Sequence, residues 1–183
     1  MLLDFRFQNY KSFLEEACFS MMAAPKQKGL DYSLFNIKNH GKGIKGLCSS
    51  VIYGSNAAGK TTVVGAMDTF RSIVLRGHIR DSEDVSSPNH AASKLSLIPN
   101  NSLTKAAPVE FFIDFIVDKF RIQYGVVMDL GLFLDSKHKR KILAETLTVN
   151  GNMIFERIHI DNTSTSLKVE PCKEVATLFS KTA

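Results

Sequence analysis

The chain has 183 residues, of which 44% are hydrophobic and 22% are charged, and its net charge is +5. These values are typical of one soluble globular domain with a hydrophobic core, and the mild positive charge allows nucleic-acid contact without demanding it. No apolar run approaches the roughly 18–20 residues of a membrane span. The start of the chain has an early acid, Asp4, and no basic n-region, so it is unlike a secretion signal. Cys18, Cys48 and Cys172 lack C-x-x-C spacing, which argues against a disulfide framework or zinc site and favours a reducing, cytoplasmic setting.

Two short strands are predicted at the start of the chain, over residues 1–7 and 15–21, because apolar and polar residues nearly alternate there. The intervening segment, 8–13, is expected to be a turn. Residues 23–46 hold four glycines and a proline among several lysines, so they are predicted to be mostly loop, with one short strand near 32–37.

Residues 54–61 read Gly-Ser-Asn-Ala-Ala-Gly-Lys-Thr and match the phosphate-binding pattern G-x-x-x-x-G-K-[ST] at every fixed position. Residues 48–53 before them are predicted to form a short buried strand. Apolar residues then recur at helical spacing from Lys60 to Arg76, and Gly77 is a natural stop. Strand, glycine loop and helix in this order are the context in which the pattern binds phosphates.

Each residue of this loop has a predicted role. Gly54 and Gly59 allow backbone angles that let successive amides turn toward a polyphosphate, at the positive end of the following helix. Lys60 is expected to contact the β- and γ-phosphates, and the Thr61 hydroxyl to bind Mg²⁺. The predicted cofactors are therefore ATP and Mg²⁺; a preference for GTP stays open, because no base-reading N-K-x-D motif is present. The predicted nucleotide site comprises Gly54, Ser55, Asn56, Ala57, Ala58, Gly59, Lys60, Thr61 and Thr62, with Lys60 and Thr61 as catalytic candidates and Thr61 as the metal ligand.

The second half of the chain reads as antiparallel strands. Residues 78–108 are polar and proline-containing and are predicted to be a long connection with at most one short helix. Strands are expected over 109–117 and 120–129, joined by a tight turn, and over 141–149 and 153–159, joined across Asn150-Gly151. Residues 166–169 are a further candidate strand, and 174–181 a candidate terminal helix.

Several of these segments together resemble the ABC-type ATPase heads of the RecF, SMC and OLD-nuclease group, also called AAA15-like ATP-binding proteins. The resemblance rests on Phe-Gln-Asn-Tyr-Lys-Ser-Phe at 7–13, on Tyr-Gly-Ser-Asn-Ala-Ala-Gly-Lys-Thr-Thr at 53–62, and on the order of the later strands. It implies an α/β fold: the N-terminal lobe of a P-loop NTPase, with a mixed sheet, a Walker A helix and accompanying antiparallel strands. Residues 1–183 would then form one partial ATPase domain.

The chain also departs from this family. It has no segment like the L-S-G-G-Q signature and no apolar run ending in Asp-Glu, as the Walker B motif requires. The resemblance therefore implies a completing lobe, supplied by a partner or a second copy, and a role in DNA maintenance or anti-phage defence. Three hypotheses stay open: an ATP-hydrolysing enzyme, a nucleotide-binding switch without turnover, and a partial domain that does not function alone.

Other candidates have ordinary structural explanations. Asp114 imitates a Walker B aspartate but is expected to be an outward-facing acid within a strand, and Asp129 is expected to open a turn. Gln123 lies inside a predicted strand. In the resembling heads the turn that contains Lys11 and Ser12 approaches the nucleotide, although a solvated turn is nearly as well supported.

A compact basic run follows at 137–141. Lys137, Lys139, Arg140 and Lys141 are candidate contacts to DNA phosphates, since heads of the resembling group often work on DNA. No aromatic residues are interleaved to stack bases, and a solvated basic loop explains the run equally simply.

Overall fold

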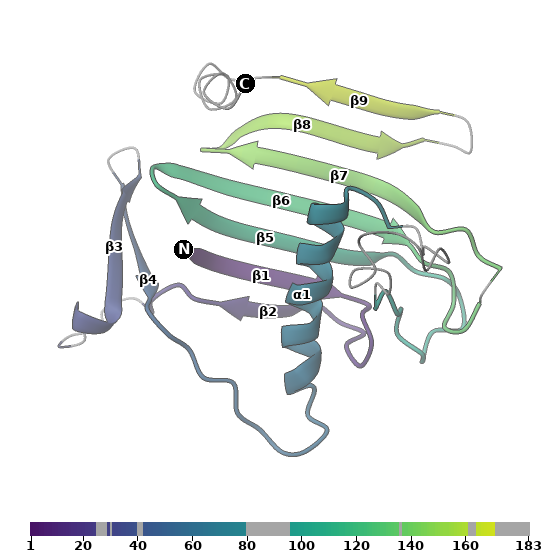
Figure 1. Ribbon diagram of the computed structural model, residues 1–183, viewed down its shortest axis with the longest axis horizontal. Coiled ribbons are helices and arrows are strands. Elements are labelled where there is room, and N and C mark those ends of the chain that lie inside the picture. Colours follow the sequence, from purple (N-terminus) through teal and green to yellow (C-terminus); the bar gives the residue numbers. More distant parts are fainter. Residues whose placement is uncertain are drawn as a thin grey trace, which may run out of the picture.

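The computed structural model describes residues 1–24, 29, 31–39, 42–79, 96–135, 137–160 and 164–170. In these ranges it shows a seven-stranded sheet, a separate two-stranded hairpin and one long helix, α1 (Lys60–Arg76), which crosses one face of the sheet (Figure 1). The helix spans the predicted residues, and Gly77 ends it in the left-handed conformation, with its amide donating to the carbonyl of Ile73.

The large sheet has the strand order β2-β1-β5-β6-β7-β8-β9, and each neighbouring pair is antiparallel. The mixed sheet expected from the sequence is therefore wrong for the described residues. Hairpins and short loops join most consecutive strands, and a short connection forces its two strands to run in opposite directions. The strands are β1 (Leu2–Gln8), β2 (Ala17–Ser20), β5 (Val109–Val117), β6 (Phe120–Asp129), β7 (Lys141–Val149), β8 (Asn152–His159) and β9 (Thr165–Val169).

Two predicted hairpin turns are confirmed. Asn150 and Gly151, with φ of 52° and 83°, join β7 to β8, which is the geometry of a two-residue hairpin with both central residues left-handed. The Asn150 side chain also accepts a hydrogen bond from the amide of Arg121 at 2.9 Å. Asp118, with φ of 52°, lies in the tight turn between β5 and β6.

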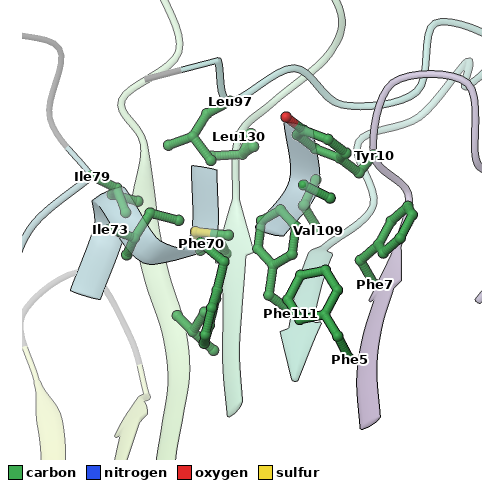
Figure 2. Packing of buried hydrophobic residues seen from close by; sticks show 13 residues of the cluster. Phe5, Phe7, Tyr10, Phe70, Ile73, Ile79, Leu97, Val109, Phe111 and Leu130 are labelled. Carbon is green, nitrogen blue, oxygen red and sulfur yellow. The ribbon is translucent and has the colours of Figure 1, made fainter. Parts of the chain in front are cut away.

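The hydrophobic core lies between α1 and the sheet, and five of its 13 buried residues are aromatic (Figure 2). Phe70 of α1 lies 5.7 Å from Phe5, 5.9 Å from Phe111 and 5.6 Å from Tyr124, measured between ring centroids. Burying one such side chain contributes about 1.5–3 kcal/mol. The helix is thus fixed to the sheet by its middle turn, and its N-terminal end, which follows the glycine loop, is held in place.

The two-stranded hairpin was only half predicted. The strand expected near 32–37 is present as β3 (Leu34–Asn39), preceded by a short 3₁₀ turn (Asp31–Ser33), but its partner β4 (Lys42–Leu47) was assigned to loop. Gly43 and Gly46 conceal the strand pattern. Gly46 lies close to the end of the Met1 side chain, 2.6 Å from where a Cβ atom would be. The predicted terminal helix at 174–181 lies outside the described residues.

Asp114 is buried, and its expected outward exposure is wrong. Its side chain is 1% exposed, because Arg121 covers it with a hydrogen-bonded ion pair at 2.6 Å and Gln123 donates a further hydrogen bond at 3.1 Å. The hydrogen bond to Asp114 raises the pKa of Arg121. Asp114 therefore has a structural role in the β5–β6 hairpin and is not available as a Walker B aspartate.

Tyr124 gives the fold a predicted sensitivity to alkali. Burial, followed by the hydrogen bond that its hydroxyl donates to Glu145, raises the pKa of Tyr124 above its ordinary value of 10.0. A raised pKa of an acid in the folded state stabilises the fold fully below the unfolded pKa, and this contribution is lost as the pH rises above it. We expect the free energy of unfolding to fall between pH 9 and pH 11.5, and to fall less in Tyr124→Phe.

Urea denaturation at several pH values between 8 and 11.5 measures this effect. The matched control is Tyr32→Phe, because Tyr32 is 84% exposed and its replacement should leave the pH dependence unchanged. At pH 8 the Tyr124→Phe variant should lose about 1 kcal/mol, the net contribution of one hydrogen bond. The same alkaline slope in wild type and Tyr124→Phe would contradict the assignment.

Candidate nucleotide-binding site

The loop 54–59 is curled immediately before helix α1. Ala57 and Gly59 both have positive φ, 62° and 86°, and the amide of Ala58 donates to the carbonyl of Ser55 at 3.3 Å. Such left-handed turns direct successive amides toward one side of the backbone, which is how a loop forms a concave anion site. The left-handed backbone predicted for the loop glycines is present at Gly59, whereas Gly54 has no positive φ and Ala57 has one instead. That the loop binds a phosphate stays a prediction.

The Lys60 side chain folds back over this loop. Its ammonium donates hydrogen bonds to the carbonyl oxygens of Gly54, at 2.9 Å, and Ser55, at 2.6 Å. These bonds close the loop into a ring that begins at Gly54 and ends at Lys60. The positive charge of Lys60 consequently lies against the loop backbone, directly before the helix.

The start of α1 has amides that precede its first internal hydrogen bonds. The first of these bonds are donated by Thr62 and Val63, both to the carbonyl of Gly59, at 2.9 and 3.2 Å. Gly59 provides no side-chain cap, and the first turn contains no acidic residue. Because the amides of Lys60 and Thr61 come before that point, this helix end offers donors and a positive partial charge to an anion.

The turn at 10–13 packs directly against the glycine loop. The Ser12 hydroxyl lies 3.3 Å from that of Thr62, and a Cβ added at Gly59 would lie 2.8 Å from the Phe13 ring. The Lys11 ammonium would be 3.9 Å from a Cβ added at Gly65, in the second turn of α1. The structure thus brings Ser12 next to the start of α1 and Lys11 next to its second turn. That this turn approaches a nucleotide stays a prediction.

Buried polar side chains hold this turn in position. The Tyr10 hydroxyl shares a hydrogen bond with Thr69 of α1 at 3.0 Å and donates another to the carbonyl of Ser96 at 2.9 Å. Asn100 donates from its amide to the Asn9 side chain at 3.1 Å and from its own side chain to the Lys11 carbonyl at 2.8 Å.

The sequence did not indicate these anchors. Asn9 and Asn100 look like ordinary turn residues, and their pairing across 91 positions becomes visible only in the fold. The seven-residue segment at 7–13 was the one available signal, and it came from the family resemblance.

The predicted buried strand over 48–53 is not formed. The segment has no strand partner among the described residues, and Val51 and Tyr53 are 81% and 89% exposed. A strand is stabilised by backbone hydrogen bonds to its neighbours, and 48–53 belongs to neither of the two sheets that the described residues form. The apolar pattern of 48–53 is that of a strand, but no neighbouring strand among the described residues pairs with it.

The structure divides the basic run at 137–141 between two places. Lys137 and Lys139 are exposed, whereas Arg140 and Lys141 line a cavity of about 460 Å³ near the C-terminal end of α1, together with Arg157. Contact of this run with DNA stays a prediction.

The other candidates keep ordinary roles. Asp129 accepts a hydrogen bond from the amide of Gly131 at 3.0 Å, which confirms that it opens a turn, and Gln123 lies within β6. The described residues contain no cluster of three or more His, Cys, Asp or Glu side chains able to hold a metal ion. In the same part of the chain, no helix is long and apolar enough to cross a membrane.

Comparison with protein families gives one match. The model of a family described as "AAA domain, putative AbiEii toxin, Type IV TA system" matches residues 49–165. This span exceeds half of the chain and begins just before the glycine loop, so the chain belongs to this family of AAA domains and to the P-loop ATPases. No curated protein and no solved structure matches the chain.

Proposed function

We propose that the chain binds MgATP with the loop 54–62 and forms part of an ATPase. One observation carries this proposal: the curled loop and the Lys60 ammonium folded over it lie together at the uncapped N-terminal end of a 17-residue helix. Membership of the AAA family supports the same assignment. The nucleotide's triphosphate would be bound where loop amides, helix end and ammonium all favour negative charge.

The residues of the loop divide the work of binding. Lys60 would exchange its carbonyl partners for the β- and γ-phosphate oxygens. Thr61 is exposed in the first turn of α1, and its hydroxyl would bind Mg²⁺, which supplies neutralisation of the phosphate charge. Asn56, at the exposed tip of the loop, is placed to orient the terminal phosphate or a water molecule. The Thr62 hydroxyl is directed to Ser12, so its role is to join the loop to the turn at 10–13.

Lys11 would form the second wall of this site. Its backbone is fixed on both sides, by the amide donating to the Ile98 carbonyl at 3.0 Å and by Asn100, so its side chain is presented from a rigid position. We expect Lys11→Ala to weaken MgATP binding by about three- to tenfold, the effect of one partly solvated charge, without lowering the free energy of unfolding. Isothermal titration calorimetry measures the affinity, with Lys105→Ala as a surface-lysine control. Equal loss in both variants would contradict a local role.

A completing lobe is the second part of the proposal. Val51, Ile52 and Tyr53 expose apolar surface in an unpaired extended segment, and Val64 and Leu75 of α1 are 60% and 70% exposed. Strands from a partner or a second copy of the chain would pair with 48–53 and cover this surface. This is the arrangement of the ABC-type RecF, SMC and OLD-like heads that the sequence resembles, and in such heads the missing Walker B and signature residues lie in the second lobe.

Measuring ATP turnover and MgATP binding by the purified chain distinguishes the three hypotheses: enzyme, switch and partial domain. ATP turnover by the chain, alone or with a second copy closing over the nucleotide, supports an ATP-hydrolysing enzyme. MgATP binding without turnover supports a nucleotide-dependent switch that awaits its partner. Aggregation without nucleotide binding supports a partial domain that requires its completing lobe to function. Failure of a monodisperse sample to bind MgATP would contradict the proposal itself.

The biological setting is proposed by analogy. The family description names a putative toxin of a type IV toxin–antitoxin system, which agrees with the expectation of a defence role more closely than with DNA maintenance. A growth assay tests this: expression should slow bacterial growth, and Lys60→Ala should restore it. Slowing by both forms would show that any toxicity is independent of the nucleotide.

A further inference from the structure

A second concave surface lies on the side of the molecule where β6 ends. It is a cavity of about 370 Å³ between the loop that follows β6 and the segment 97–99, and it is distinct from the glycine loop. Leu97 and Leu130, which are 3% and 5% exposed, form its floor, and Figure 2 shows these two side chains together. We call this surface the β6–β7 groove; its apolar lining residues are Leu97, Ile98, Pro99, Leu132, Phe133 and Leu134.

The rim of the groove exposes three consecutive apolar side chains. Leu132, Phe133 and Leu134 are 36%, 42% and 84% exposed. Leu134 also has φ of 65°, a left-handed conformation that costs a leucine about 1–2 kcal/mol. Strain and solvent-exposed apolar area both oppose folding, so their coincidence at one rim indicates a surface shaped for contact with another molecule.

Polar contacts fix both walls of the groove. On one side, the Ile98 carbonyl accepts from the amide of Lys11 at 3.0 Å. On the other, Asp129 pairs with His138 at 2.9 Å and accepts from the amide of Gly131. Gly131 is required here, because its φ is 72° and a Cβ would lie 2.5 Å from the His138 ring. The groove is therefore preformed, which lowers the entropic cost of binding.

Positive charge borders the apolar surface. Lys137 and Lys139 are exposed and flank His138, which lines the groove, and Arg140 lines it as well. Two carboxylates lie close by: Asp129 contacts His138, and Asp135, which is exposed and lines the groove, accepts from the amide of Lys137 at 3.2 Å. The basic side chains of Lys137, Lys139 and Arg140 outnumber them. The rim consequently presents lysine ammonium groups to an incoming ligand.

We propose that the β6–β7 groove binds a peptide segment of a partner protein that carries apolar side chains next to carboxylates. The apolar side chains would fill the groove between Phe133 and Ile98, and the carboxylates would meet Lys137 and Lys139. A nucleic-acid strand fits less well, because Phe133 is the one aromatic side chain among the described residues of the lining and a phosphate backbone gains nothing from a leucine-rich cavity. This proposal is independent of nucleotide binding.

Selection from a random 12-residue peptide library against the purified chain tests the proposal. We expect the retained peptides to be enriched in Glu or Asp together with Leu or Phe. Fluorescence anisotropy of the strongest binder then gives its affinity for wild type and for two variants. Phe133→Ser with Leu134→Asn removes the apolar rim, and asparagine tolerates the left-handed backbone of Leu134. Lys137→Glu with Lys139→Glu reverses the charge.

Each double variant should lower the affinity for the peptide by about tenfold or more, which is the effect of losing an interface hot spot. The matched controls are Leu167→Ser, at a leucine 62% exposed on β9, and Lys119→Glu, in the distant β5–β6 turn; both should bind normally. Lack of enrichment, enrichment in basic residues, or binding unaffected by the variants would overturn the proposal. So would tighter binding of a single-stranded oligonucleotide or phosphatidylserine vesicles that depends on Lys137 and Lys139 but not on Phe133.

Discussion

Lys60→Ala is expected to weaken MgATP binding by about 10- to 100-fold, which corresponds to the loss of one charge-assisted hydrogen-bonding group. The Lys60 ammonium is bound to the loop by hydrogen bonds to the carbonyl oxygens of Gly54, at 2.9 Å, and Ser55, at 2.6 Å. Removing it leaves the loop amides without the charge that favours a polyphosphate. Titration calorimetry with MgATP and with the non-hydrolysable analogue AMP-PNP measures the change.

Two comparisons make this result specific. Lys119→Ala removes a lysine from the distant β5–β6 turn and should leave the affinity for MgATP unchanged. The thermal midpoint of Lys60→Ala should stay within a few degrees of the wild-type value, because the side chain is bound to an exposed loop and not to the core. An unchanged affinity of Lys60→Ala for MgATP would contradict the assignment of the loop as a nucleotide-binding site.

Gly59→Ala should abolish measurable nucleotide binding through geometry and not through charge. Its φ of 86° disfavours any side chain by about 1–2 kcal/mol, and a Cβ would lie 2.8 and 2.9 Å from two atoms of the Phe13 ring. The loop or the turn at 10–13 would have to move, and either movement separates the two walls of the site. Titration calorimetry measures the loss of nucleotide affinity, and the NMR signals of the Phe13 ring report movement of the turn at 10–13.

Gly77→Ala is the matched control for this substitution. Gly77 has a similar φ of 70°, but nothing lies within 4 Å of an added Cβ, and it is at the opposite end of α1. It should therefore lose stability from backbone strain while keeping its nucleotide affinity. Adding Phe13→Ala to Gly59→Ala removes the collision and should recover part of the binding. If both single glycine variants bind MgATP equally well, the contact between turn and loop has no functional role.

Local patterns in the sequence predicted most of the fold. Apolar spacing located α1 to the residue, and the pair Asn150-Gly151 located the β7–β8 turn, because in both cases the determining interactions lie within a few positions of the chain. In the β3–β4 hairpin, only β3 could be predicted, because the sequence around β4 carries no clear local strand pattern. Its second strand contains Gly43 and Gly46, which conceal the strand pattern, and the side chain that lies against Gly46 comes from Met1, which is distant in sequence.

The segment 48–53 shows where such reasoning fails. Its apolar run has the composition of a buried strand, but a strand forms only beside another strand, and the described residues provide none there. Asp114 illustrates the opposite error. Alternation assigned it to the outer face, and the covering side chains of Arg121 and Gln123 then buried it.

The candidate site was predictable in part. The pattern at 54–61 identified the loop residues, and the backbone angles at Ala57 and Gly59 agree with a concave loop. The wall formed by Lys11 and Phe13 depends on hydrogen bonds of Tyr10 to Thr69 and Ser96, across 59 and 86 positions. Partners so distant in sequence leave no local signal, so the second wall could be anticipated only through resemblance.

The central claim is that the backbone amides between 54 and 61 surround the triphosphate of ATP. Amide chemical shifts, followed by ¹H–¹⁵N NMR while MgATP is added, test it most directly. We predict that the largest shifts fall on Gly59, Lys60 and Thr61 and saturate with added nucleotide, whereas the amides of β8 and β9 stay unchanged. Shifts that leave those three amides unmoved, or that spread evenly over the sheet, would contradict the account.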